Sequence, residues 1–152
     1  MHMVSLKTAA ALTGWSRRTL WRRIAAGKIF KQNRDEPLGR TDVALEALAD
    51  DIGVELTDEA LGLIQLADKG QAEAQTDIAI LFMESGLSGK AVYWLRAAAE
   101  QGYGDAMHLL GKCYLSGQGV DRDEREGLSW IRRAATGGHL IACAQMQALS
   151  GT

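Results

Sequence analysis

An internal repeat of 32 to 36 residues is the feature of this sequence that most constrains its fold. The stretch Gly70 to Ala74 recurs 32 residues later as Gly102 to Ala106, and loosely, after another 36, as Gly138 to Ala142. The stretch Ala91 to Ala98 recurs as Gly127 to Ala134 at an offset of 36. Repeats of this length, punctuated by glycine and with small residues at fixed places, predict stacked pairs of helices.

The repeats also predict how the helices pack. Small residues allow neighbouring helices to approach closely, and tryptophans fill the gap between repeats; the small residues are Ala74, Ala79, Ala106 and Gly111. The segment Ser85 to Gly89 is four residues shorter than the matching loop that begins at Gly117, so we expect a tighter turn there. We place the repeat domain at residues 57–150, where Thr57 caps the first helix and about two and a half units follow.

The repeated units resemble Sel1-like repeats, which are relatives of tetratricopeptide repeats. The best match is the loop from Gly117 to Asp123 leading into Trp130 and Ala134, and the resemblance spans about residues 60 to 149. It implies a scaffold for protein contacts rather than catalysis.

Charge divides the chain into two unlike parts. Residues 1–40 carry nine Lys and Arg against two acids, a net +7, whereas the remainder carries eight against seventeen, a net −9. This asymmetry indicates a head that binds a polyanion on an acidic body. The alternative is a solvated basic face without a partner.

The basic head begins with two predicted helices. Ser5 can cap the first, with Leu6, Ala9, Ala10 and Leu12 on its inner face, and Thr13 and Gly14 end it. Ser16 can cap the second, in which Leu20 and Ile24 point one way while Arg17, Arg18 and Arg22 point elsewhere. Two short helices joined by a tight turn that contains glycine predict a helix-turn-helix.

Residues 5–29 resemble the winged helix-turn-helix of MerR-type and excisionase-type proteins. The resemblance implies a wing over Lys28 to Arg40, with one strand at 29–32, a turn at 33–37 and a return at 38–40. Asp35 and Glu36 in that turn would repel phosphate. We expect Thr41 to cap a third helix from Asp42 to about Asp50, which completes a domain over residues 1–50. The first three residues enter no predicted element.

Double-stranded DNA is the partner that this head predicts. A helix fits the major groove, arginine can pair two ways with guanine, and free N–H groups at a helix start can hold a phosphate. Arg17, Arg18 and Arg22 would read bases. The residues expected to lie on phosphate are Ser16, Lys28, Lys31, Arg34 and Arg40. Trp21 lies either on the wing or at the DNA surface, Trp15 fills the core, and Arg23 can equally bridge to an acid.

The end of the sequence is uncharged from Ala134 to Thr152. Leu140, Ile141, Met146 and Leu149 are spaced for one helix, and a helix without a charged face tends to be buried. We expect these four residues to form a two-fold dimer interface, which would present two heads to a palindromic site. The alternative is that this helix docks back on its own chain.

Residues for catalysis are scarce. His139 and Cys143 are four apart and could share a metal ion, but two ligands make a poor site and packing is the preferred interpretation. We expect no enzyme activity and no cofactor. No run of about 18 apolar residues occurs, and two cysteines make no disulfide framework, so we expect a cytoplasmic protein that does not enter a membrane.

These expectations combine into one fold and three functional hypotheses. The fold is mainly α, a helix-turn-helix module with a small β wing followed by an α-solenoid of about two and a half paired-helix repeats. The first hypothesis is a sequence-specific transcriptional regulator whose repeats dimerise or bind a protein partner. The second is a repeat adaptor, without DNA binding, in a signalling or secretion assembly. The third is an architectural factor that bends DNA with little sequence preference.

Overall fold

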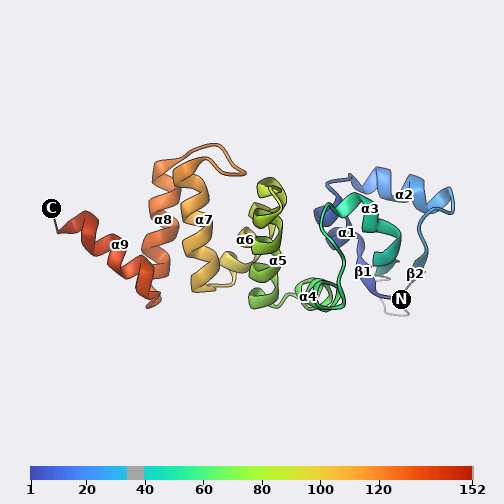
Figure 1. Ribbon diagram of the computed structural model, residues 1–152, viewed down its shortest axis with the longest axis horizontal. Coiled ribbons are helices and arrows are strands. Elements are labelled where there is room, and N and C mark those ends of the chain that lie inside the picture. The colour runs from blue at the N-terminus through green and yellow to red at the C-terminus, as the bar shows by residue number, and fades with distance from the viewer. Residues whose placement is uncertain (34–39, 152) are drawn as a thin grey trace. The chain divides into compact units, whose positions relative to one another are not determined.

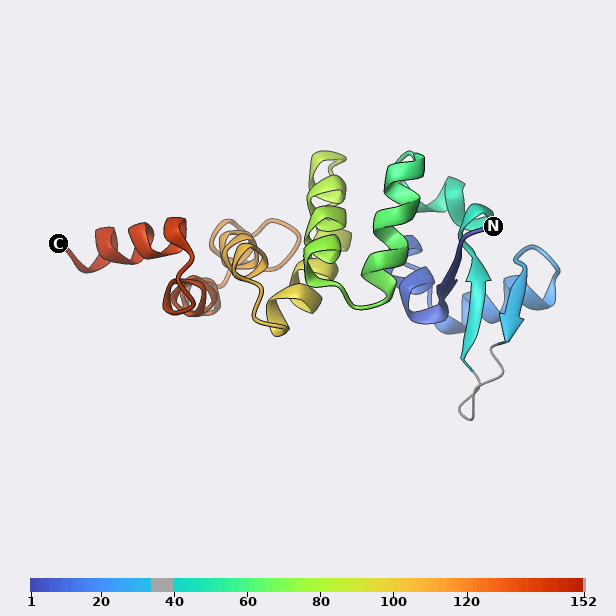
Figure 2. The ribbon, with the colours of Figure 1, turned by 90° about the horizontal axis from the view of Figure 1, so that it is seen from below.

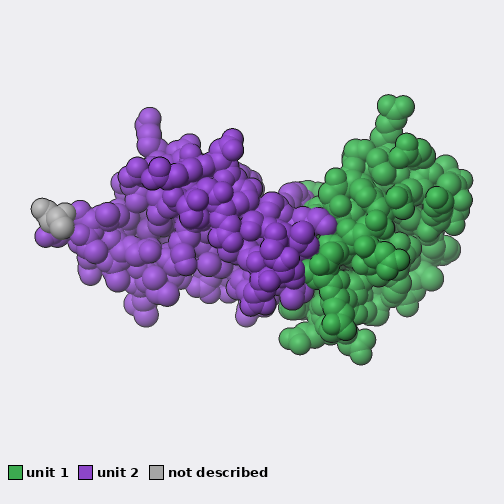
Figure 3. Space-filling view, turned by 45° about the horizontal axis from the view of Figure 1, so that its top comes forward, with its two compact units in different colours: residues 1–69 green, residues 70–152 purple. Residues whose placement is uncertain are grey.

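The computed structural model describes residues 1–33 and 40–151, which belong to two compact units, Met1–Lys69 (unit 1) and Gly70–Thr152 (unit 2) (Figure 3). Unit 1 extends beyond the boundary expected between residues 50 and 57. It includes a further helix, α4 (Asp58–Asp68), which contacts the first strand. Thr57 caps this helix as predicted, since its hydroxyl accepts a hydrogen bond from the N–H of Ala60 at 3.1 Å.

Unit 1 combines short helices with a small sheet (Figure 1). Its other elements are β1 (Met3–Ser5), α1 (Leu6–Thr13), α2 (Arg17–Ala25), β2 (Lys31–Asn33), β3 (Thr41–Ala44), the 3-10 helix η1 (Leu45–Leu48) and α3 (Ala49–Ile52). The strand order is β1-β3-β2, and both pairs are antiparallel (Figure 2). Val43 of the central strand lies opposite Val4 on one side and Lys31 on the other.

The first two helices begin and end where the sequence predicts. Ser5 caps α1 by accepting from the N–H of Thr8 at 3.2 Å, and Ser16 caps α2 by accepting from the N–H of Thr19 at 3.2 Å. Gly14 ends α1 with a φ of 77°, a left-handed conformation that costs glycine little. Leu12 and Leu20 are fully buried beneath the two helices.

The region after the second helix differs from the prediction. The helix expected from Asp42 to Asp50 is wrong, because residues 41–44 are the central strand and only the residues from Leu45 onward are helical. Pairing with two neighbouring strands satisfies the backbone of β3 on both sides. The strand expected at 29–32 is shifted, since β2 begins at Lys31, and the next strand in the described residues, β3, follows Arg40. Residues 34–37 of the predicted turn and residues 38 and 39 of the predicted return lie outside the described residues.

The start of the chain, which no predicted element included, forms strand β1. Met3 lies opposite Ala44, and the carbonyl of His2 accepts a hydrogen bond from the N–H of Leu45 at 2.7 Å. The His2 ring and backbone N–H both bond to the carboxylate of Glu46. These first residues are therefore part of the fold of unit 1.

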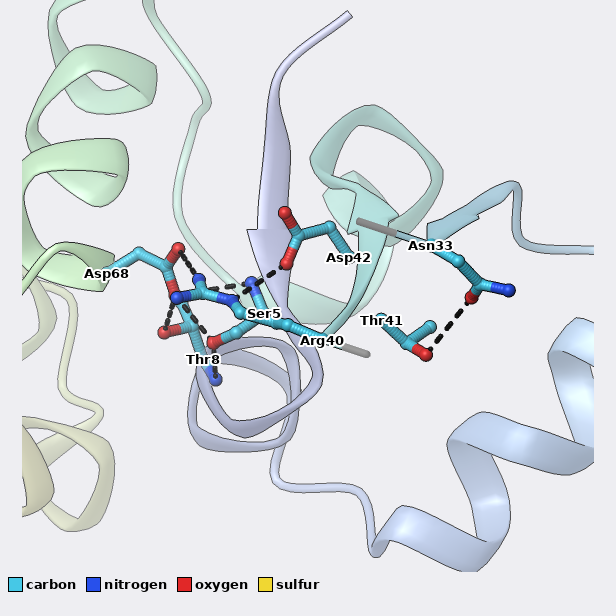
Figure 4. A network of polar contacts seen from close by, with 7 residues as sticks. All are labelled: Ser5, Thr8, Asn33, Arg40, Thr41, Asp42 and Asp68. Atoms are coloured by element: carbon cyan, nitrogen blue, oxygen red, sulfur yellow. Dashed lines mark hydrogen bonds and ion pairs between the residues drawn. The ribbon is translucent and has the colours of Figure 1, made fainter. Parts of the chain in front are cut away.

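A buried carboxylate, Asp68 at the end of α4, joins four elements of unit 1 (Figure 4). Its Oδ1 accepts hydrogen bonds from the hydroxyls of Ser5 at 2.5 Å and Thr8 at 2.6 Å. Its Oδ2 accepts from the guanidinium of Arg40, which also donates to Asp42 at 2.9 Å. Helix α4 is thereby attached to β1, α1 and the start of β3.

The pKa of Asp68 lies below its ordinary value. Burial by itself raises the pKa, but the hydrogen bonds from Ser5 and Thr8 and the charge of Arg40 favour the ionised form and outweigh it. The network therefore holds a carboxylate rather than a carboxylic acid.

Unit 2 consists of antiparallel helix pairs, and the described residues contain five helices (Figure 1). They are α5 (Ala72–Glu84), α6 (Ser88–Glu100), α7 (Gly104–Ser116), α8 (Glu124–Thr136) and α9 (Leu140–Ser150). The pairs α5–α6 and α7–α8 are complete, and α9 stands where the first helix of a third pair would stand. Trp94 and Trp130 are buried as predicted. The turn between α5 and α6 is the tighter one, as expected from its four missing residues.

Helices α7 and α8 meet at two glycines. A Cβ on Gly111 would lie 2.6 Å from Ile131 Cγ1 and 2.8 Å from the carbonyl oxygen of Gly127, and a Cβ on Gly127 would lie 2.9 Å from the carbonyl oxygen of Gly111. Contacts this short are excluded for real side chains, so only glycine permits this spacing. The equivalent residues of the preceding pair, Ala79 and Ala91, are both fully buried.

We predict that Asp68→Asn destabilises unit 1 by about 2 kcal/mol, because the amide cannot accept from all the donors that face it. In the wild-type chain the lowered pKa of Asp68 gives stability that is complete above pH ~4 and is lost as the pH falls through the folded-state pKa. The variant should lack this acid-dependent part. Urea titrations at several pH values, followed by the amide NMR signals of Val4 and Val43, measure both effects. Glu59→Gln makes the same chemical change at an exposed site of α4. It should leave the stability of unit 1 and its pH dependence nearly unchanged.

We predict that Gly111→Ala destabilises unit 2 by about 1–3 kcal/mol, since the added methyl group forces α7 and α8 apart and outweighs the gain in helix propensity. Urea titration followed by the amide signals of Leu110 and Ile131 measures it. The matched control is Gly89→Ala in α6, where a Cβ meets nothing within 4 Å. That variant should be neutral or more stable by up to ~1 kcal/mol. Equal effects at the two positions would contradict the close approach.

Candidate binding surfaces

The second helix of unit 1 carries exposed arginines. Arg17, Arg18 and Arg22 are all exposed, and none forms an ion pair with a residue in the described ranges. Ser16 is exposed too, but its hydroxyl already caps the helix and bonds to that of Thr19 at 3.0 Å.

Aromatic side chains lie next to this basic helix. Trp21 is 40% exposed, and the ammonium of Lys31 stands 5.4 Å from the centre of its ring. Phe30 is 57% exposed, and Lys28 is also exposed. Trp15 is half-buried beneath the guanidinium of Arg23, 4.0 Å from the ring centre, so Arg23 makes a cation–π contact instead of a bridge to an acid.

Two residues of the predicted DNA-contacting set, Arg40 and Arg34, differ from the others. Arg40, whose side chain is 38% exposed, is paired with Asp42 and Asp68, both nearly inaccessible to water. The two carboxylates raise its pKa in spite of burial, which lowers it. Arg34 lies outside the described residues.

The last helix of unit 2 exposes apolar side chains. Leu140 is 84% exposed, Ile141 60% and Leu149 58%, whereas Met146 is half-buried. The buried side of α9 faces α8, with Ala142 fully enclosed, and Gln145 accepts a hydrogen bond from His108 of α7 at 2.9 Å. The helix is therefore docked on its own repeat along one side and uncovered along the other.

A pair of stacked histidines holds α9 to α7. The rings of His108 and His139 are 4.9 Å apart and nearly parallel, and His139 bonds to Asp105 at 2.7 Å. His139 also caps α9 through Nδ1, which accepts from the N–H of Ala142. Burial lowers the pKa of His108. Cys143 donates to the carbonyl of Ala135, away from His139, so the two residues that could have shared a metal ion have separate partners.

Residues 1–33 and 40–151 contain no cluster of three or more His, Cys, Asp or Glu side chains that could hold a metal ion. None of the helices described is long and apolar enough to cross a membrane.

The first of two apolar grooves in unit 2 lies between α5 and α7. Its volume is about 410 Å³, and its lining residues are Met83, Leu109, Lys112, Cys113, Leu115, Ser116 and Gln118. Gln118, in the loop after α7, donates to the hydroxyl of Ser88 at 3.2 Å. A Cβ on Gly119 would clash with the carbonyl oxygen of Ser88, so this loop rests directly on the start of α6. We call this the α5–α7 groove.

The second groove, the α7–α9 groove, has a volume of about 390 Å³. Its lining residues are Leu115, Glu124, Leu128, Ile131, Gln145, Ala148 and Leu149. Leu115 belongs to both grooves. Sequence reasoning missed the two grooves, although the repeat offsets of 32 and 36 residues identify equivalent positions on successive helices.

Comparison with known proteins identifies the repeats. The family model of the Sel1 repeat matches residues 72–103 and 104–139. The chain is similar to the solved Sel1 repeat protein of Oxalobacter formigenes, at 36% identity and a TM-score of 0.52, over 57% of this chain and 68% of that one. It is also similar to a protective antigen of uropathogenic Escherichia coli that displays an SLR fold, at 30% identity and a TM-score of 0.54, over 59% of this chain.

The match spans only 21% of the Escherichia coli antigen, about a fifth of its length. No curated protein matches the chain at a significant level. These matches concern the helical repeats.

Proposed function

This chain belongs to the Sel1 repeat family, and we propose that its helical repeats bind a protein partner. The observation that carries the proposal is the set of exposed apolar side chains on α9. Leu140, Ile141 and Leu149 expose large apolar side chains on a helix without any charged residue. Exposed apolar patches of this kind are typical of interaction sites, because water is released when a partner covers them.

The two grooves extend this apolar surface. Leu149 lies both on the exposed part of α9 and at the edge of the α7–α9 groove. A partner that covers α9 can therefore insert a side chain into the groove beside it. Such a central pocket, filled by an apolar anchor, supplies most of the affinity in protein interfaces. A second copy of this chain, joined through α9, is one partner that fits this description.

We predict that a photo-cross-linking amino acid at Leu149 forms a discrete adduct when the full chain is irradiated in an extract of its source organism. The reason is that this side chain lies within the proposed contact. Gel electrophoresis and mass spectrometry then identify the adduct, and twice the mass of the chain would indicate a homodimer. Leu149→Asp should weaken binding of the identified and purified partner about tenfold or more.

The matched control places the cross-linker at Glu100, an exposed position at the end of α6 that lines neither groove. That chain should form no discrete adduct. If both positions form the same adducts, or if Leu149→Asp binds the partner as tightly as the wild type, the repeats do not bind through this surface.

A second candidate function, DNA binding by unit 1, is favoured by one observation. Arg17, Arg18 and Arg22 are exposed on one short helix and have no carboxylate partner among the described residues. The exposed Trp21 adds a flat apolar surface beside them. Arginines at the start of a helix can reach guanine in the major groove and attract phosphate on the way. With both units active, the chain would connect a DNA site to a protein partner, as a transcriptional regulator does.

We predict that the full chain binds a random 20-base-pair duplex and that log K falls with log [NaCl], with a slope that Arg18→Ala makes shallower by ~0.9. Fluorescence anisotropy between 50 and 200 mM NaCl measures the slope. Arg125→Ala, which removes an exposed arginine from α8 in unit 2, should leave it unchanged. Identical slopes for the two variants, or no binding at 50 mM NaCl, would exclude α2 as a DNA-contacting helix.

A further inference from the structure

The two grooves of unit 2 are the same feature in successive repeats. With the 32-residue offset between α5 and α7, Met83 of the first groove corresponds to Leu115 of the second. With the 36-residue offset between α7 and α9, three further lining residues of the first groove match three of the second: Leu109, Lys112 and Cys113 correspond to Gln145, Ala148 and Leu149. Because Leu115 lines both, the grooves adjoin at α7.

Each groove contains one charged residue, and the two charges are opposite. Lys112 is the only charged residue among those described in the lining of the α5–α7 groove, and Glu124 is the only one in the lining of the α7–α9 groove. Both side chains are exposed, and neither forms an ion pair within the described residues. Beside an apolar wall, where water is partly excluded, an unpaired charge attracts an opposite charge more strongly than in open solvent.

The repeat architecture does not require these charges. At the position equivalent to Lys112, the next repeat has Ala148, and at the position equivalent to Glu124, the preceding repeat has Ser88. An equivalent groove forms between successive repeats in spite of these differences. The two charges therefore distinguish the grooves from each other, and a ligand that crosses both would meet them in a fixed order.

The grooves also differ in how far they are covered. Cys113 in the first is 1% exposed, whereas the equivalent Leu149 is 58% exposed. In the first repeat pair, the loop after α7 closes over Ser88 through Gln118 and Gly119. Glu124, which is equivalent to Ser88, is exposed.

We propose that the α5–α7 and α7–α9 grooves together recognise one segment of a protein partner, with apolar side chains seated in the grooves, an acidic residue at Lys112 and a basic residue at Glu124. This inference rests on the proposed function and specifies its partner. The apolar contacts supply affinity, and the two opposite charges fix the direction of the segment across α7. A segment of reversed charge order would bring like charges together in both grooves, which is strongly unfavourable.

A library of random 12-residue peptides displayed on phage, selected against the immobilised full chain, tests the proposal. Enriched peptides should carry apolar residues with Asp or Glu towards one end and Lys or Arg towards the other. For a fluorescein-labelled enriched peptide, Lys112→Glu and Glu124→Lys should each weaken binding about tenfold, and Glu124→Gln somewhat less. Replacing the peptide's acidic residue with Lys should restore its binding to the Lys112→Glu chain.

Matched controls reverse charges that lie outside the grooves. Arg125→Glu, next to Glu124 on α8, and Glu100→Lys on α6 should leave the affinity unchanged. Peptides that bind all variants equally, or that are not rescued by the reversed charge, would overturn the charge assignment while the proposed protein binding stands. A selection that enriches no peptide would overturn the groove assignment, and together with no adduct from Leu149 it would overturn the proposed function as well.

Discussion

The carboxylate of Asp68 is the interaction on which the assembly of unit 1 depends. It is almost inaccessible to water, and a buried charge is tolerated only where hydrogen bonds and an opposite charge replace its hydration. Ser5, Thr8 and Arg40 supply these, and they come from the start of α1, its first turn and the chain just before β3. Moving any of these segments away would remove one of the donors that the buried charge needs. The same network pairs the Arg40 guanidinium with two carboxylates, although the Arg40 side chain is 38% exposed.

The repeat unit could be predicted closely because its signals are local. Glycine punctuation, caps and helical spacing lie within one turn of the residues they govern, and the offset between the repeats predicted even the shorter turn between α5 and α6. The sheet of unit 1 could not be predicted this way. The choice between helix and strand for residues 41–44 depends on pairing with β1, about forty residues away, and with β2. The apolar residues Val43, Leu45 and Leu48 are compatible with a helix until those partners are known, since tertiary context overrides weak local preference.

The candidate surfaces, too, could be predicted where the signal was local and could not where it depended on a distant residue. Exposure of Arg17, Arg18 and Arg22 follows from their spacing against Leu20. The uncharged last helix, on which Leu140 and Ile141 are exposed, indicated a surface that a partner would cover. The pairing of Arg40 with Asp68 was not predicted, because Asp68 stands 28 residues later on another element. The sequence did contain a sign that Asp68 is buried. Leu61, Ile64 and Asp68 share one face of α4, so this acid lies in line with apolar residues. The DNA-contacting surface and the protein-contacting grooves remain proposals of different origin, one from charge and the other from exposed apolar area.

The glycine contact between α7 and α8 bears on what can pack against α9. In successive repeats, the position at the point of closest approach is Ala79, Gly111 and then Gln147. Alanine and glycine allow the backbone of the neighbouring helix to come near. A glutamine side chain keeps a neighbouring backbone farther away and presents an amide. A third helix pair with the tight spacing of the second is therefore sterically blocked at Gln147. A helix that packed against α9 at Gln147 would therefore lie farther from the α9 backbone than α8 lies from the α7 backbone.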